Sequence, residues 1–164
     1  VAASGRTPYT LSALKYANCM GALSISVTCN ANSPMAEEAQ ISIAPIVGPE
    51  VICGSTRMKA GTAQKMVLNM LSTGVMIRLG KVYQNYMVHL QPTNEKLVVR
   101  SVRMISQITG ASRETSERML QASRRRVPEA IVMISAGCSL EKAEEALEMA
   151  EGRVREAIEM AKKL

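Results

Sequence analysis

Residues 22–28 read Ala-Leu-Ser-Ile-Ser-Val-Thr, and residues 41–47 read Ile-Ser-Ile-Ala-Pro-Ile-Val. Both stretches are short, apolar and rich in β-branched residues, and they end at the turn-forming pairs Cys29-Asn30 and Gly48-Pro49, which is typical of buried strands. Residues 9–20 carry helical signals ahead of the first stretch, so helix and strand alternate. This alternation favours a parallel sheet, and we predict an α/β fold.

The chain is expected to become helical beyond these strands. Residues 60–78 predict a helix that is apolar on most faces, which places it in the core or at a subunit interface. A further helix is expected from Asn94 to about Thr109, and no strand signal follows Pro92.

The C-terminal part of the chain repeats with an offset of 27 residues. Each unit predicts two short helices, the first capped by a serine with a Glu in its first turn and the second starting at Val-x-Glu-Ala-Ile. The matched residues include Gly110 and Gly137, Ser112 and Ser139, and Glu114 and Glu141. The last three helices, at about 128–137, 139–150 and 153–163, resemble a ubiquitin-associated three-helix module.

Composition narrows the class of protein. The chain has 164 residues, of which 47% are hydrophobic and 21% charged, a balance typical of a globular protein with one ordinary domain and a small appendage. No apolar stretch approaches the roughly 20 residues that a membrane-spanning helix needs, so we expect no membrane segment. Residues 1–3 look like the end of a strand whose beginning is missing, so we expect a fragment.

Several kinds of catalytic or metal site are excluded. The sequence has no Asp and one histidine, His89, so this chain alone cannot assemble a Ser-His-Asp triad or a His-rich zinc site. Cys19, Cys29, Cys53 and Cys138 show no C-x-x-C spacing, and no secretory signal opens the chain. We therefore expect reduced thiols, a cytoplasmic protein and no metal ion.

The net charge of +6 raises the question of a nucleic-acid partner. Residues 1–100 carry 9 Lys and Arg against 4 Glu, whereas residues 101–164 carry 11 against 10. The base-stacking aromatics that single-strand binders use are nearly absent, since there is no Trp or Phe and only four Tyr. A basic pocket for a small anion explains the charge better, and no nucleic acid is expected.

The first candidate site is the loop Ser4-Gly5-Arg6-Thr7-Pro8-Tyr9, between a strand end and a helix start. Thr7 is placed as N-cap and Pro8 as the first helical residue, so free backbone N–H groups and the positive end of the helix dipole face the Ser4 and Thr7 hydroxyls. This favours a phosphate site; the alternative is a capped turn without a ligand.

The second candidate site lies in residues 48–65, Gly-Pro-Glu-Val-Ile-Cys-Gly-Ser-Thr-Arg-Met-Lys-Ala-Gly-Thr-Ala-Gln-Lys. Ser55 and Thr56 are expected to cap the apolar helix, Arg57 can fork onto a carboxylate or phosphate, Lys59 adds a point charge, and Glu50 sits at a strand end. Alternatively, the cations lie in solvent with Glu50 as their ion-pair partner. Cations in a first turn oppose the helix dipole unless an anion is nearby, which favours a ligand.

Two weaker candidates lie further along. His89 has the chemistry of a catalytic acid, but a lone histidine in an apolar setting is more often a packed or surface residue. The run Arg124-Arg125-Arg126 is expected to be a solvated loop.

Residues 48–65 resemble the signature segment of the N-acetylmuramic acid 6-phosphate etherase and glucokinase regulatory protein family. The similarity continues through Val-Leu-Asn-Met-Leu-Ser-Thr-Gly at 67–74, Ile-Arg-Leu-Gly-Lys-Val-Tyr at 77–83 and Thr-Asn-Glu-Lys-Leu at 93–97, and it includes Ala-Ser-Gly-Arg-Thr-Pro-Tyr at 3–9. The bacterial etherases are the nearer match. Gln84 and His89 depart from the family pattern, which has Gly and Asp there.

The resemblance implies a sugar isomerase (SIS) domain, a parallel α/β sandwich, followed by a helical tail. Residues 1–91 then correspond to a partial SIS domain without its N-terminal half, and residues 92–164 to an all-α tail. Ser4, Gly5, Arg6, Thr7, Glu50, Ser55, Thr56, Arg57 and Lys59 are the expected substrate-binding residues.

The implied activity is a lyase that removes the D-lactyl ether of N-acetylmuramic acid 6-phosphate during cell-wall sugar recycling, with no metal or redox cofactor. The family's acid and base are glutamates without a matching position in this chain, so no catalytic residue is assigned and the chain alone is expected to be inactive. A homodimer is expected. The alternative is a non-catalytic sugar-phosphate-binding regulatory protein; a free-standing helical binding module is a third possibility.

Overall fold

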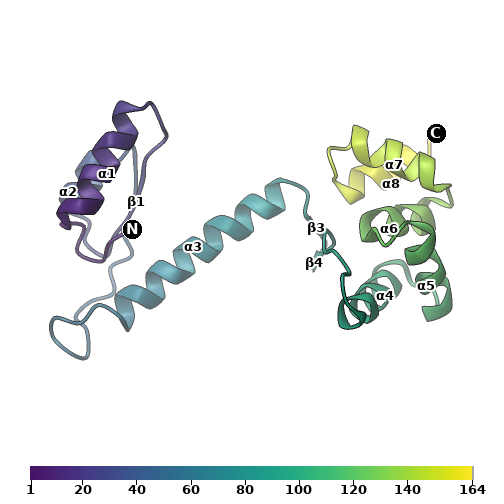
Figure 1. Ribbon diagram of the computed structural model, residues 1–164, viewed down its shortest axis with the longest axis horizontal. Helices are drawn as coiled ribbons and strands as arrows, with labels where there is room; N and C mark the ends of the chain where they lie inside the picture. The colour runs from purple at the N-terminus through teal and green to yellow at the C-terminus, as the bar shows by residue number, and fades with distance from the viewer. Residues whose placement is uncertain (164) are drawn as a thin grey trace. The chain divides into compact units, whose positions relative to one another are not determined.

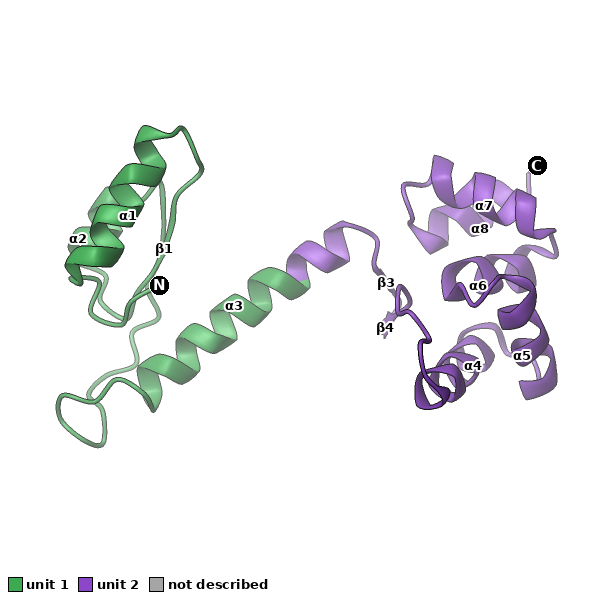
Figure 2. Cartoon of the chain, in the orientation of Figure 1, with its two compact units in different colours: residues 1–73 green, residues 74–164 purple. Residues whose placement is uncertain are grey.

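The computed structural model describes residues 1–163, which divide into two compact units at residues 73 and 74, within one long helix (Figure 2). The strands are β1 (Ile25–Val27), β2 (Ile41–Ile43), β3 (Val82–Tyr83) and β4 (Tyr86–Met87). The helices are α1 (Pro8–Cys19), α2 (Pro34–Glu38), α3 (Lys59–Arg78), α4 (Glu95–Thr109), α5 (Arg113–Ala122), α6 (Val127–Ala136), α7 (Leu140–Met149) and α8 (Val154–Ala161) (Figure 1).

In the first unit β1 and β2 pair in parallel, with Ile25 opposite Ile41 and Val27 opposite Ile43. The predicted parallel α/β arrangement is therefore confirmed, with α2 packed against both strands and against α1. The second strand is shorter than the predicted range 41–47. Pro45 has no N–H to donate to a ladder, which explains why the pairing stops at Ile43.

Residues 1–3 lie along the other side of β1. The Ala2 N–H donates to the Val27 carbonyl at 3.1 Å, and the Cys29 N–H donates to the Ala3 carbonyl at 2.8 Å. These two hydrogen bonds hold residues 2–3 beside β1, on the side opposite to β2, while the sheet itself consists of β1 and β2.

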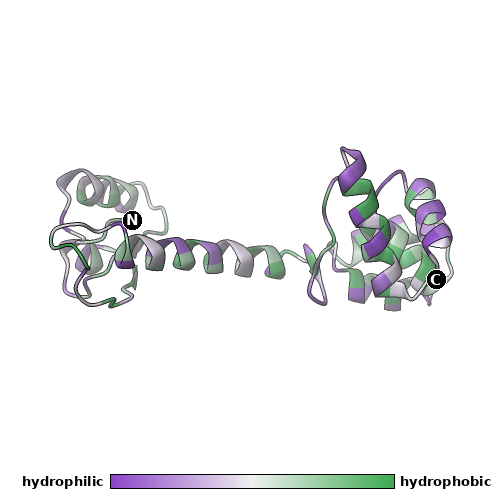
Figure 3. Ribbon diagram, turned by 90° about the horizontal axis from the view of Figure 1, so that it is seen from below, coloured by the Kyte–Doolittle hydropathy of each residue, from purple (hydrophilic) through white to green (hydrophobic). Residues whose placement is uncertain are grey.

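The long helix α3 is not buried in a core, and that part of the prediction is wrong. Only Ala60 and Val67 are buried along it. Its large apolar side chains are exposed, namely Met66, Leu68, Met70, Leu71, Val75, Met76 and Ile77, and hydrophobic stretches recur along its length (Figure 3). No part of residues 1–163 covers them, so the alternative prediction of a subunit interface remains.

The second unit opens with a short hairpin that the sequence did not suggest. The antiparallel strands β3 and β4 are joined by Gln84 and Asn85, with Val82 opposite Met87. Gln84 has a φ of 53°. Glycine is the residue that most readily adopts this left-handed conformation, so the glutamine at this position gave no turn signal that would have indicated a hairpin.

Helices α4–α8 pack around one apolar core, and no strand follows Pro92 within the described residues. Helix α6 contacts α4, α5, α7 and α8, so it lies at the centre of the bundle. Its residues Val127, Ala130, Ile131 and Val132 are fully buried. The helical character predicted for this part of the chain is therefore confirmed.

The sequence repeat has a structural counterpart. Helices α5 and α7 are offset by 27 residues, and each begins at the serine that the sequence predicted as its cap. The Ser112 hydroxyl accepts from the Thr115 N–H at 3.2 Å and the Ser139 hydroxyl from the Lys142 N–H at 3.4 Å. The turns that follow also match, since Arg125 and Gly152 both have positive φ, 62° and 80°, and both donate to the carbonyl five residues earlier at 2.8 Å.

Candidate functional site

The two predicted site segments meet at the carboxyl end of β1. The Asn30 side-chain amide donates to the Ser4 carbonyl at 3.5 Å, and the Cys29 thiol lies 3.9 Å from the Ala60 carbonyl at the start of α3. The pair Cys29-Asn30 therefore contacts the Ser4 loop on one side and α3 on the other. Ligands of open α/β sheets bind at this edge.

Gly5 fixes the position of the first loop. Its φ is 65°, and a Cβ there would lie 2.3 Å from the Ser33 hydroxyl, so no other residue fits. The Gly5 carbonyl accepts a hydrogen bond from the Met35 N–H at 3.2 Å, and the Ser33 hydroxyl caps α2 by accepting from the Ala36 N–H. The loop is thus held against the start of α2.

The remaining loop residues partly match the predicted phosphate site. Thr7 is the N-cap of α1 and Pro8 is in its first turn, as predicted, but the Thr7 hydroxyl makes no capping hydrogen bond. The Ser4 hydroxyl accepts from the Arg6 N–H at 3.3 Å. With no side-chain cap, the first-turn N–H groups of α1 remain available to an anion.

Glu50 caps α3, whereas Ser55 and Thr56 do not, so the predicted caps were wrong. The two Glu50 carboxylate oxygens accept from the Lys59 N–H and the Ala60 N–H, each at 3.0 Å. A carboxylate satisfies two donors and carries the negative charge that a helix N-terminus favours, which a hydroxyl does not. These two hydrogen bonds hold the pKa of Glu50 below its usual range.

Arg57 and Lys59 are exposed on the same stretch. Within residues 1–163 neither side chain forms an ion pair, and Glu50 engages the backbone instead of pairing with them. Because the Glu50 carboxylate already stabilises the N-terminus of α3, the helix does not depend on the side chains of Arg57 and Lys59. Both cations can therefore reach a ligand anion.

Two residues of this region carried weaker sequence signals. Asn30 connects the two loops. The only feature of the sequence that pointed to it was its polar side chain directly after a predicted strand. Gln64 lies on the same face of α3 as Ala60 and Val67, and its side-chain nitrogen is buried without a hydrogen-bond partner in the described structure.

The Cys29 thiol is a poor nucleophile, because burial, and second the charge of Glu50, raise its pKa.

His89 belongs to the second unit, in the segment after β4. It is half-buried, and its pKa is lowered, first by burial and second by the charge of Lys81.

No helix within residues 1–163 is both long and apolar enough to cross a membrane.

Comparison with known proteins gives a consistent picture. Residues 1–74 match the SIS domain, and residues 84–124 match the C-terminal lid domain of glucokinase regulatory protein. The chain is 60% identical over 148 residues to an N-acetylmuramic acid 6-phosphate etherase of Clostridium botulinum (strain Loch Maree / Type A3), and 55% identical over 147 residues to N-acetylmuramic acid 6-phosphate etherase 1 of Enterococcus faecalis. It is 52% identical over 151 residues to N-acetylmuramic acid 6-phosphate etherase 2 of Vibrio cholerae serotype O1.

These alignments cover 90–92% of this chain and 49% of each relative, so the chain spans about half the length of the relatives it matches. The resemblance to the etherase and regulatory protein family is confirmed.

Proposed function

We propose, from the 52–60% identity with these etherases, that the protein carrying this chain is a carbon–oxygen lyase. It cleaves the D-lactyl ether of N-acetylmuramic acid 6-phosphate to N-acetylglucosamine 6-phosphate and D-lactate. The observation that carries the proposal is the extent of the match, and the SIS match over residues 1–74 includes both loops at the carboxyl end of β1.

The chain supplies substrate-binding groups for this reaction. The uncapped N-terminus of α1, with the Ser4 and Thr7 hydroxyls nearby, suits the sugar phosphate. Arg57 presents a fork of N–H donors suited to a phosphate or to the lactyl carboxylate, and Lys59 adds a charge. Gly5, Arg6, Ser55 and Thr56 complete the proposed binding set.

Glu50 is a poor candidate for the acid or the base. Elimination followed by addition of water needs both an acid and a base, and both Glu50 oxygens already accept backbone hydrogen bonds. We therefore assign Glu50 to holding α3 and its cations in place. The resemblance puts the acid and base on glutamates that have no counterpart in this chain, and it implies no metal or redox cofactor.

The proposal extends to the cellular setting and the assembly. We place the protein in the cytoplasm, where it works in cell-wall sugar recycling. The exposed apolar residues of α3 support a homodimer. The mutual contacts of α6, α7 and α8 support a three-helix module of the ubiquitin-associated type in the tail.

The test is substrate turnover by the protein carrying this chain. Arg57→Ala should weaken substrate binding by roughly 2–4 kcal/mol, the range for truncating a desolvated charge pair, and Arg57→Lys should also bind poorly because the fork is lost. Arg118→Gln, on an exposed face of α5, is the matched control. Release of D-lactate by the wild type with unchanged kinetics in Arg57→Ala would contradict the assigned role, and no release at all would contradict the activity.

The match of residues 84–124 to the lid domain of a regulatory protein favours a second candidate, a non-catalytic sugar-phosphate sensor. The same assay separates the two. A sensor binds N-acetylmuramic acid 6-phosphate without releasing D-lactate.

A further inference from the structure

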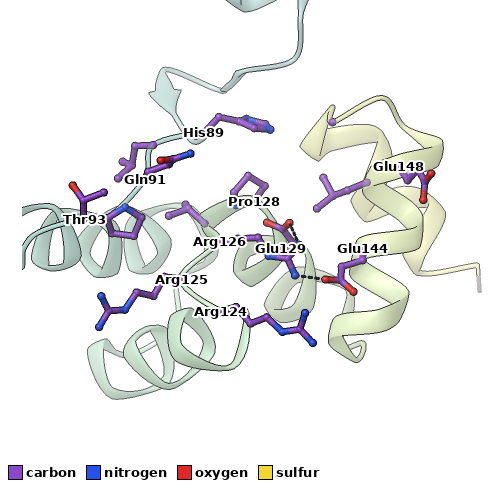
Figure 4. Close-up of a pocket in the computed structure, with 15 residues that line it drawn as sticks. His89, Gln91, Thr93, Arg124, Arg125, Arg126, Pro128, Glu129, Glu144 and Glu148 are labelled. Carbon is purple, nitrogen blue, oxygen red and sulfur yellow. Dashed lines mark hydrogen bonds and ion pairs between the residues drawn. The ribbon is translucent and has the colours of Figure 1, made fainter.

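The second unit contains a cavity that the proposed lyase site does not use. Its volume is about 610 Å³, within the range of roughly 300–1,000 Å³ that holds small organic ligands. It is open to solvent and is lined by residues 89–93, the turn between α5 and α6, the first turn of α6, one face of α7 and Gly152 (Figure 4).

The charged residues around this cavity largely neutralise one another. Arg126 lies at their centre, where its guanidinium pairs with Glu129 of α6 at 3.1 Å and also with Glu144 of α7 (Figure 4). Three arginines and three glutamates line the cavity, so its net formal charge is zero. Arg124 and Arg125 extend away from each other at its edge and form no clamp for an anion (Figure 4).

Gln91 and Thr93 supply the polar groups that a ligand can reach. Both residues are exposed, and their amide and hydroxyl belong to the lining of the cavity. His89 also belongs to the lining, but its Nδ1 is buried, so a ligand atom cannot reach this nitrogen.

The rest of the wall is apolar. It is formed by Leu90, Pro92, Val127, Pro128 and Leu147, all of them buried. The cavity therefore combines apolar surfaces with neutral or mutually compensated groups that both donate and accept hydrogen bonds.

We propose that this cavity binds an uncharged sugar of one or two rings. Each sugar hydroxyl can donate and accept at once, which suits the amide, the hydroxyl and the carboxylates, while the C–H faces of the ring suit the apolar wall. The lining has no net formal charge, so it offers a phosphate no excess of positive charge. This site is distinct from the proposed lyase site, whose ligand is a sugar phosphate.

The test is a titration of the full chain followed by amide NMR, with N-acetylglucosamine and its β1,4-linked dimer as uncharged probes and inorganic phosphate as the charged one. We expect saturable shifts at residues 89–91, 124–127 and 152 with a sugar and none there with phosphate. Phosphate shifting the same amides, or sugars giving no saturable change there, would overturn the proposal. The lyase assay plays no part in this readout, so failure of one proposal leaves the other testable.

Variants add a second measurement. Gln91→Leu changes an exposed side chain and should weaken sugar binding by about tenfold, equivalent to about 1.4 kcal/mol. Thr93→Val removes the hydroxyl of the other exposed polar residue in the lining and should do the same. Arg118→Gln, which is not part of the cavity lining, should bind like the wild type. Wild-type affinity in both Gln91→Leu and Thr93→Val would contradict the assigned contacts.

Discussion

Arg125 and Gly152 occupy the same position in the two copies of the repeat, and both have a left-handed backbone. In that conformation a residue with a Cβ lowers the free energy of unfolding by about 1–2 kcal/mol. Replacing it by glycine removes this cost, but the more flexible unfolded chain takes back about 0.4–1 kcal/mol of the gain. We predict that Arg125→Gly raises the free energy of unfolding of the helical unit by about 0.5–1 kcal/mol. Urea denaturation of the full chain measures it.

The matched substitution in the second copy is Gly152→Ala. A Cβ there would lie 3.6 Å from the His89 Nε2, an ordinary contact, so the backbone alone resists it. We expect this variant to lose about 1 kcal/mol. A loss of stability in Arg125→Gly would instead show that the arginine side chain makes a stabilising contact in the turn.

At the scale of elements, the pairing of Glu50 with α3 predicts a pH dependence. The folded pKa of Glu50 is lowered, so its contribution to stability is present above the unfolded pKa of about 4.3 and is lost as the pH falls through the folded pKa. Glu50→Gln should therefore be less stable than the wild type at pH 7, and the difference should shrink below about pH 4. Hydrogen exchange at the Lys59 and Ala60 amides reports this directly.

Glu38→Gln, at the end of α2, is a matched control because Glu38 does not cap a helix N-terminus. An unchanged exchange rate at Lys59 in Glu50→Gln at pH 7 would show that the carboxylate does not hold the first turn of α3.

Which elements the sequence could predict depends on how local their signals are. The Ser112 and Ser139 caps follow from a side chain and an N–H three residues later, and both predictions are confirmed. The Glu50 cap spans nine residues, and a cap at that distance depends on how the intervening loop turns back. Sequence periodicity contains no information about that turn.

The same limit applies to the candidate site. The sequence identified both polar loops, because N-caps, glycine and clustered cations are local features. That the loops share the end of β1 depends on the pairing of β1 with β2 and on the hydrogen bonds of residues 2–3 to β1. The alternation of helix and strand predicted a parallel sheet but not which loops meet at its edge. The contact role of Asn30 depends on this pairing, so sequence reasoning passed over it.

At the scale of the whole molecule, the exposed apolar residues of α3 predict self-association. Met70 is 62% exposed and Val75 is 53% exposed, on a helix of 20 residues that carries five further large exposed apolar side chains. An apolar surface of this extent is unfavourable in water and typical of an interface. We predict a dimer in sedimentation equilibrium that Met70→Glu weakens by at least about tenfold, because a buried carboxylate without a partner is costly.

Asn69→Glu introduces the same charge at a neighbouring exposed position of α3 and controls for net charge and helix propensity. If the contact is apolar and centred on Met70, Asn69→Glu should retain most of the association while Met70→Glu does not. A wild type that stays monomeric at every concentration would exclude a stable homodimer through α3. Equal weakening by both variants would show that repulsion between charged copies, and not burial of the Met70 side chain, controls the association.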